Sequence, residues 1–249
     1  MIALDAATVL LQWSAGGVAF LWVTGRHGEV GAGYGWLLRS IYLLLALGSG
    51  VIGLTFGAVP VRDAAAFTSA AAIAVALGVS LARRRRPMPT LDLIAPAVAS
   101  VGLIAAALDA GGAPAVSLLR TFAGAAFLGV VTDAMLLGHW YLVQPGLPRR
   151  HLNELVRWLG RCWPVEVGAL LLPTGMLSVF TGTIDDGWGG QLGWFWALCA
   201  ITTLVLVFVT RAALRERSYS AVMAATGLLY LAILTAFGTD LVARAVLDV

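Results

Sequence analysis

Asp133 and Glu166 are the residues best suited to chemistry, because each is a carboxylate inside a long apolar segment. An ionisable group in such a place is by default either a functional site or a member of a buried ion pair. Two carboxylates that share one poorly solvated site can take up and release a proton near neutral pH. The sequence therefore predicts that both acids face one shared cavity and handle protons there.

Four further residues on the same two segments would form the mouth of this cavity: His139, Trp140, Arg157 and Arg161. We expect them one or two helical turns nearer than the acids to the basic connection 144–150. Together with the acids they would supply hydrogen-bond donors and a proton source, which a quinone head group needs. The alternative is that the two arginines extend to the membrane interface and the acids bond to neighbouring helices.

Depth along the helices is the reason for placing the two acids together. Asp133 precedes His139 by six residues, about 9 Å along a helix axis, and Glu166 follows Arg161 by five, about 7–8 Å. Consecutive antiparallel helices with a short connection are usually neighbours. We therefore expect both carboxylates at a similar depth.

The composition indicates an all-α, polytopic membrane protein. Of the 249 residues, 60% are hydrophobic and only 12% are charged, whereas a soluble domain carries roughly 25% charged residues. All 16 basic residues are arginines, and most lie in connections beside apolar segments. This pattern favours contact with membrane lipid and does not favour a nucleic-acid partner.

About twenty mostly apolar residues are needed to cross a bilayer, and on that rule the chain contains eight spans in a single domain, residues 1–249. The predicted spans are 4–24, 37–59, 64–82, 91–108, 116–142, 153–181, 191–210 and 219–244. Residues 14–21 loosely repeat residues 122–128, so a 4+4 duplication into residues 1–110 and 111–249 stays open.

The connections alternate in charge. Odd-numbered connections carry Arg26, Arg83–Arg86, Arg149 and Arg150, and Arg211, Arg215 and Arg217, whereas even-numbered ones carry Arg62 with Asp63, Asp109, and Asp185 with Asp186. The positive-inside rule then predicts an inner-membrane protein with both termini outside. On the last span, Asp240 and Arg244 are four residues apart, which predicts a structural ion pair near the outer interface.

Other cofactors are not favoured. A buried bis-histidine haem needs two inward histidines on facing helices, yet of the three histidines, His27 and His151 lie in or beside connections. Cys162 and Cys199 are isolated, so they are expected to be small buried hydrophobes, and no metal site is predicted. Hydrolase, zinc-protease and P-loop motifs are absent, which argues against an enzyme acting alone.

The first span, with Gln12-Trp13-Ser14-Ala15-Gly16-Gly17, the eight-span count and the polar niche resemble the haem-free membrane anchor subunits of the dimethyl-sulfoxide-reductase and polysulfide-reductase type. The resemblance implies a non-catalytic membrane subunit of a respiratory complex, which exchanges electrons and protons between quinone and a partner's iron–sulfur protein. Two other classes compete with it: a proton-coupled small-molecule transporter, and a scaffold or assembly subunit without chemistry.

The predicted orientation can be measured by labelling single cysteines in intact cells with a membrane-impermeant maleimide. In a Cys162→Ala, Cys199→Ala background, Asp109→Cys is expected to react from outside, and Arg84→Cys only after lysis, because basic connections stay in the cytoplasm. Labelling at position 84 before lysis would reverse the orientation.

Overall fold

The computed structural model describes residues 4–83 and 89–248, and within them the chain is all-helical, which confirms the predicted fold class. The elements are α1 (Ala6–Gly25), α2 (Ala32–Phe56), α3 (Pro60–Arg83), η1 (Pro89–Leu93), α4 (Ile94–Asp109), α5 (Pro114–Trp140), α6 (Arg150–Leu171), α7 (Leu177–Phe180), α8 (Gln191–Ala213) and α9 (Tyr219–Leu247). Of the predicted basic run 83–86, residues 84–86 lie outside the described part.

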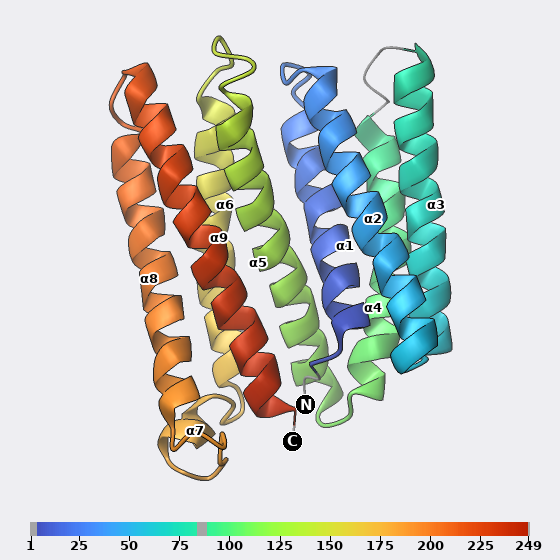
Figure 1. Cartoon of the computed structure of the whole chain (residues 1–249), viewed down its shortest axis with the longest axis vertical. Coiled ribbons are helices and arrows are strands. Elements are labelled where there is room, and N and C mark those ends of the chain that lie inside the picture. The colour runs from blue at the N-terminus through green and yellow to red at the C-terminus, as the bar shows by residue number, and fades with distance from the viewer. Residues whose placement is uncertain (1–3, 84–88, 249) are drawn as a thin grey trace.

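The long helices run alternately up and down, so both termini lie at the same end of the bundle (Figure 1). We call this the terminal end. The connections that follow α1, α5 and α8 lie at the other end, together with Arg26, Arg149 and Arg215, and we call it the arginine-rich end. The two ends therefore differ in charge as the sequence predicts, while the side that faces the cytoplasm stays a prediction.

Seven helices of the described residues are long and apolar enough to cross a membrane: α1 to α5, α8 and α9. The protein is therefore a multi-pass membrane protein. Helix α6 has 22 residues, about 33 Å at the usual rise per residue. It packs against α5 and α8, but it carries five charged residues: Arg150, Glu154, Arg157, Arg161 and Glu166. It is an amphipathic member of the bundle, not a uniformly apolar span.

The predicted sixth span, 153–181, extends too far at its C-terminal end. Helix α6 begins at Arg150 and ends at Leu171, and the chain then turns before the short α7. The cause is Pro173, which forces the preceding residue out of helical geometry. Leu172 is indeed extended, with φ −86° and ψ 150°.

The connection after α7 is fixed by Asp186. Its carboxylate accepts backbone N–H groups of Gly190 at 2.8 Å, Leu192 at 2.9 Å and Trp188 at 3.0 Å. These hydrogen bonds, the one from Gly190 above all, hold the pKa of Asp186 below its ordinary value. They also anchor the first turn of α8, whose leading N–H groups have no partners within the helix.

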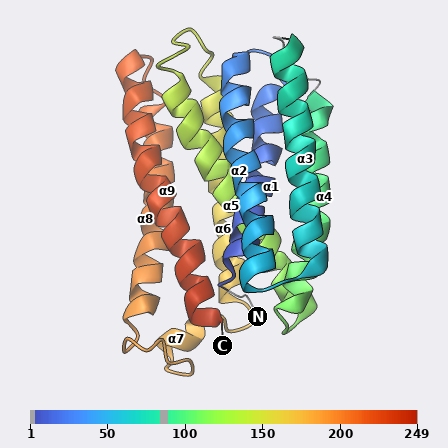
Figure 2. The same ribbon diagram turned by 45° about the vertical axis from the view of Figure 1, so that its right-hand side comes forward.

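The helices form two rings of four. In the first ring, α1 contacts α2 and α4, and α3 contacts both of those. In the second ring, α5 contacts α6 and α9, and α8 contacts both of those. The two groups lie side by side in Figure 2 and meet along α1 and α5. A 4+4 duplication would produce this pattern, although the duplication itself stays a prediction.

Glycines allow the two rings to meet at backbone distance. A Cβ atom on Gly16 of α1 would lie 1.7 Å from the carbonyl oxygen of Ala125 on α5. A Cβ atom on Gly129 of α5 would lie 2.2 Å from the carbonyl carbon of Gly16. Small residues at such crossings replace side-chain packing with direct backbone contact.

Gly16→Ala is expected to destabilise the protein by about 2 kcal/mol or more, because the new methyl group overlaps the α5 backbone. The measurement is reversible unfolding in mixed detergent micelles. Gly78→Ala on α3 is the matched control, since its Cβ meets nothing within 4 Å. Equal effects at the two positions would contradict the close crossing.

Candidate functional site

Asp133 lies on α5 and faces the first ring. Its side chain is fully buried, and the hydroxyl of Tyr42 on α2 donates to its Oδ1 atom. Its Oδ2 atom has no hydrogen-bond partner among the described residues. The hydroxyl of Tyr34 donates to the backbone carbonyl of Asp133 at 3.3 Å. A pair of buried tyrosines therefore encloses this acid.

Glu166 lies on α6 in the second ring, in a different setting. It is fully buried, and its nearest charged groups are Asp240 and Arg244 of α9 and Arg120 of α5. Neither of its carboxyl oxygens accepts a hydrogen bond from a donor among the described residues, and its carboxyl lies within hydrogen-bonding reach of the Asp240 carboxyl. Burying a carboxyl without a partner is costly, and the cost is far greater for the ionised form.

The predicted shared cavity for the two acids is wrong in its geometry. Arg120, which neighbours Glu166, precedes Asp133 by thirteen residues on α5, about 20 Å along the axis. The depth argument failed because α6 starts at Arg150, so Glu166 is sixteen residues into its helix. Asp133 is only seven residues from the end of α5. The functional roles of the two acids stay predictions.

Three of the four residues expected at the mouth lie apart from both acids. His139 is exposed, and its Nδ1 atom lies 3.3 Å from the hydroxyl of Tyr230. Arg161 is exposed and stacks over Trp158, with 5.2 Å between guanidinium carbon and ring centroid. Arg157 is exposed on the same helix. The structure does not assemble these residues into one polar niche.

Trp140 is the one of the four that lies near the surroundings of Asp133. Its ring centroid is 5.8 Å from that of Tyr34. Its Nε1 atom donates to Oε1 of Gln144 at 3.2 Å, and the same oxygen accepts the backbone N–H of Gly31 at 2.9 Å. Trp140 therefore packs against Tyr34 and the connection between α1 and α2 at the arginine-rich end.

The predicted ion pair between Asp240 and Arg244 is confirmed. Nε of Arg244 donates to Oδ2 at 2.7 Å and Nη2 to Oδ1 at 3.1 Å. The two residues are 0% and 1% exposed, so the pair lies inside the bundle and not at its surface. Gly124 of α5 makes room for it, since a Cβ atom there would lie 2.7 Å from Oδ1 of Asp240.

Arg120 lies in the same region and donates hydrogen bonds to carbonyl groups at the C-terminal end of α6. Its Nε atom donates to the carbonyl oxygen of Ala169 at 3.1 Å, and its Nη2 atom donates to that of Leu172. The last carbonyls of a helix lack partners within the helix and carry partial negative charge. A buried guanidinium group at this place satisfies them and also lies close to Glu166.

A second ion cluster lies at the terminal end of the first ring. Arg62 is 1% exposed and binds Asp5, Asp63 at 2.8 Å and the carbonyl oxygen of Gly57 at 2.6 Å. Asp5 also caps α1 by accepting the backbone N–H of Ala7 at 3.1 Å. Both charged partners of Arg62 are therefore carboxylates of the protein itself, Asp5 and Asp63.

A pocket of about 680 Å³ connects the two clusters. Its walls come from α1, α2, α3, α4, α5 and α9 and from the connection between α2 and α3. The lining residues include Leu4, Ala6, Ile52, Phe56, Val59, Ala106 and Ala107, and the polar ones are Asp5, Thr8, Arg62, Asp109, Thr121 and Arg244. Arg244 is thus shared between the pocket and the surroundings of Glu166.

The buried charges around this pocket are one acid in excess, and a further lining acid, Asp109, is exposed. The buried or partly buried acids are Asp5, Asp63, Glu166 and Asp240, and the buried arginines are Arg62, Arg120 and Arg244. Four carboxylates face three guanidinium groups, so a neutral Glu166 brings the sum to zero. The arrangement can hold one exchangeable proton next to an apolar pocket.

No protein family, curated protein or solved structure matches this chain.

Sequence reasoning missed the residues that build the terminal-end site. In the sequence, Arg62 and Asp63 match topology determinants, because a charged pair beside an apolar segment is typical of a connection. The sequence places Arg120 only at the outer start of the fifth span. The position of Arg120 was the available signal for a buried site. An arginine two turns into an apolar helix needs a partner inside the bundle.

Asp240→Ala is expected to destabilise the protein by about 3 kcal/mol, because it leaves Arg244 buried without a counter-ion. The double variant Asp240→Ala, Arg244→Ala should cost less than the sum of the two single changes. The measurement is unfolding in detergent for all four members of the cycle. Simple additivity would mean that the two side chains are not coupled.

Proposed function

We propose that this membrane protein binds a quinone in the terminal-end pocket and exchanges a proton with it through Glu166, as the membrane subunit of a redox complex. The observation that carries the proposal is the place of Glu166: a buried carboxyl that accepts no hydrogen bond from a donor among the described residues, beside the carboxyl of Asp240 and next to the Arg244 that lines the pocket.

The pocket suits a quinone in size and lining. Its volume of about 680 Å³ lies within the range of about 300–1,000 Å³ that small-molecule sites occupy. Most of its lining residues are apolar, as a quinone ring and its side chain require. The hydroxyl of Thr121 and the guanidinium groups of Arg62 and Arg244 are hydrogen-bond donors for carbonyl oxygens.

The charges favour a neutral ligand over an anion. Each arginine in the lining is already paired, Arg62 with two carboxylates and Arg244 with one. An anionic ligand would have to compete with these acids and would add negative charge to a site that already has an excess acid. A neutral molecule that gains and loses protons meets neither penalty.

Glu166 is suited to supply or accept the proton. Its neutral form avoids the cost of an unpaired buried charge, and Arg120 and Arg244 can stabilise its ionised form for the time of a transfer. When a partner supplies two electrons to the bound quinone, the quinol also needs two protons. Glu166 provides one of them, and water at the open mouth of the pocket provides the other.

A redox complex is favoured by the resemblance of the first span to quinone-linked anchor subunits. Gln12 of that span lies at this site, since its Nε2 atom is close to the position a Cβ would take on Gly124, beside Asp240. Gln12 also bonds to the carbonyl oxygen of Thr121, which lines the pocket. The segment that carries the resemblance is thus part of the proposed quinone site.

Proton-coupled transport is the second candidate, and the depth of the two acids favours it. Asp133 lies toward the arginine-rich end and Glu166 toward the terminal end, on opposite sides of α5. Buried acids at two depths are what a proton pathway across a bilayer requires. Proton flux in liposomes that requires Asp133 would favour this candidate.

Ubiquinone-1 is expected to bind the purified protein in nanodiscs, and Ala58→Trp should weaken binding at least tenfold, because the indole fills the mouth of the pocket. Ala58 is exposed, so the change does not disturb the core. The control is Ala74→Trp, an exposed position on α3 away from the pocket. Calorimetric titration measures both, and equal affinities would exclude this pocket.

The proton step has its own measurement, infrared difference spectroscopy during electrochemical reduction of bound ubiquinone-1. Reduction is expected to remove a protonated-carboxyl band, and Glu166→Gln should abolish that change. Asp133→Asn is the matched control and should retain it, because Asp133 lies in the tyrosine-lined site. A band that disappears in Asp133→Asn and persists in Glu166→Gln would reverse the assignment.

A further inference from the structure

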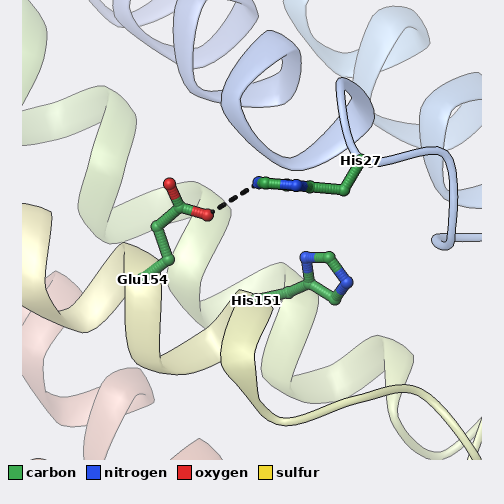
Figure 3. Close-up of side chains that lie close together, drawn as sticks. All are labelled: His27, His151 and Glu154. Atoms are coloured by element: carbon green, nitrogen blue, oxygen red, sulfur yellow. Dashed lines mark hydrogen bonds and ion pairs between the residues drawn. The ribbon is translucent and has the colours of Figure 1, made fainter.

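We propose that His27, His151 and Glu154 bind one divalent transition-metal ion, zinc by preference, at the arginine-rich end of the molecule. This site is separate from the terminal-end pocket and does not depend on the proposed quinone chemistry. It joins the connection after α1 to the first turn of α6 (Figure 3).

The three side chains bring their ligand atoms together. One nitrogen from each histidine and one oxygen of Glu154 all lie within 4.8 Å of one another. Nε2 of His27 is 3.0 Å from Oε2 of Glu154, and the two imidazole centroids are 5.2 Å apart. Ligands about 2.0 Å from a tetrahedral zinc ion lie about 3.3 Å apart, so small side-chain rotations complete the site.

His151 is arranged as metal-binding histidines are. Its Nε2 atom lies 2.6 Å from Oε2 of Glu29, and this carboxylate holds the proton on that nitrogen. Its Nδ1 atom is then left with a free lone pair. Nδ1 is buried and has no hydrogen-bond partner among the described residues, and Figure 3 shows it on the side of His27 and Glu154.

A carboxylate on the far nitrogen of a histidine is a recurrent feature of zinc sites, because it fixes the tautomer and makes the ligand nitrogen more basic. Glu29 is itself held in place. Arg150 binds its other oxygen, and Nε2 of Gln144 donates to its backbone carbonyl at 3.0 Å. The interactions of Glu29 that orient His151 therefore do not depend on a bound ion.

Glu154 divides its two oxygens between two partners. Oε1 binds Arg26, and Oε2 faces His27. The second oxygen can therefore reach an ion while the first keeps its arginine. Arg26 is the group that opposes a cation here, since its Nε atom is also 3.3 Å from Nε2 of His27. Its side chain is 37% exposed, which leaves it room to move toward solvent.

Two histidines and one carboxylate are the ligand set of zinc sites that keep a fourth position open for water. Imidazole nitrogen favours zinc and its neighbours over magnesium or calcium, which prefer oxygen ligands. His27 is exposed, whereas His151 is 1% exposed. An ion can therefore enter from the aqueous side and meet a preformed, buried ligand.

The test is titration of the chelator-treated full chain in detergent with zinc chloride, followed by calorimetry, and with cobalt chloride, followed by its visible spectrum. We expect one ion per chain and a tetrahedral cobalt spectrum. His27→Gln and His151→Gln should each lower zinc affinity at least a hundredfold. Glu29→Gln should lower it about tenfold to a hundredfold, as loss of an outer carboxylate does.

Two further variants separate the site from general effects. His139→Gln removes the remaining histidine, which contacts Tyr230 and not this cluster, and should leave zinc affinity unchanged. Arg26→Gln removes the opposing charge and should raise it. His27 is exposed, so its variant stays folded and informative even if His151→Gln does not fold. No stoichiometric zinc, or an equal loss in His139→Gln, would overturn the proposal.

Discussion

The contact between the backbones of α1 and α5 is the constraint on which the other features of the structure depend. Gly16 and Gly129 allow the two helices to touch without side chains between them. That distance lets Gln12 reach the carbonyl oxygen of Thr121 and lets Nε1 of Trp13 reach the hydroxyl of Thr132 at 2.9 Å. A wider spacing would break these polar contacts where no water can replace them.

The second constraint is that charges inside the bundle need partners of opposite sign. Arg39 meets it with Asp92 at 2.6 Å, Arg62 with Asp63, and Arg244 with Asp240. Removing one member of such a pair is far more costly than removing both. Glu166 is different, because it lies beside a completed pair and its oxygens accept no hydrogen bond from a donor among the described residues. This difference separates a candidate proton site from a structural ion pair.

The length of the apolar segments was enough to predict most apolar helices, and helical spacing was enough to predict the pairing of Asp240 with Arg244. Both features depend only on residues within a single helix. Contacts between distant segments were not predictable, since nothing local links Arg62 to Asp5 or His27 to His151. The depth of Glu166 failed for a related reason. The sequence pattern places Arg157 and Arg161 at the interface, yet they lie along the exposed side of a helix that begins at Arg150. For the zinc site, the one local signal was the spacing of His151 and Glu154 by three residues, one turn of a helix.

The terminal-end pocket takes its walls from both rings, with Ile52 and Phe56 from the first, and Thr121 and Arg244 from the second. A ligand that fills it therefore contacts both halves of the bundle near the line where they meet. Its binding free energy must depend on the relative position of the rings, which the glycine crossing of α1 and α5 fixes to within a backbone contact. A close, rigid crossing at mid-bundle thus favours one pocket shape and one set of distances to Arg244. A site that must present hydrogen-bond donors and a proton to a small neutral ligand requires that kind of preorganisation.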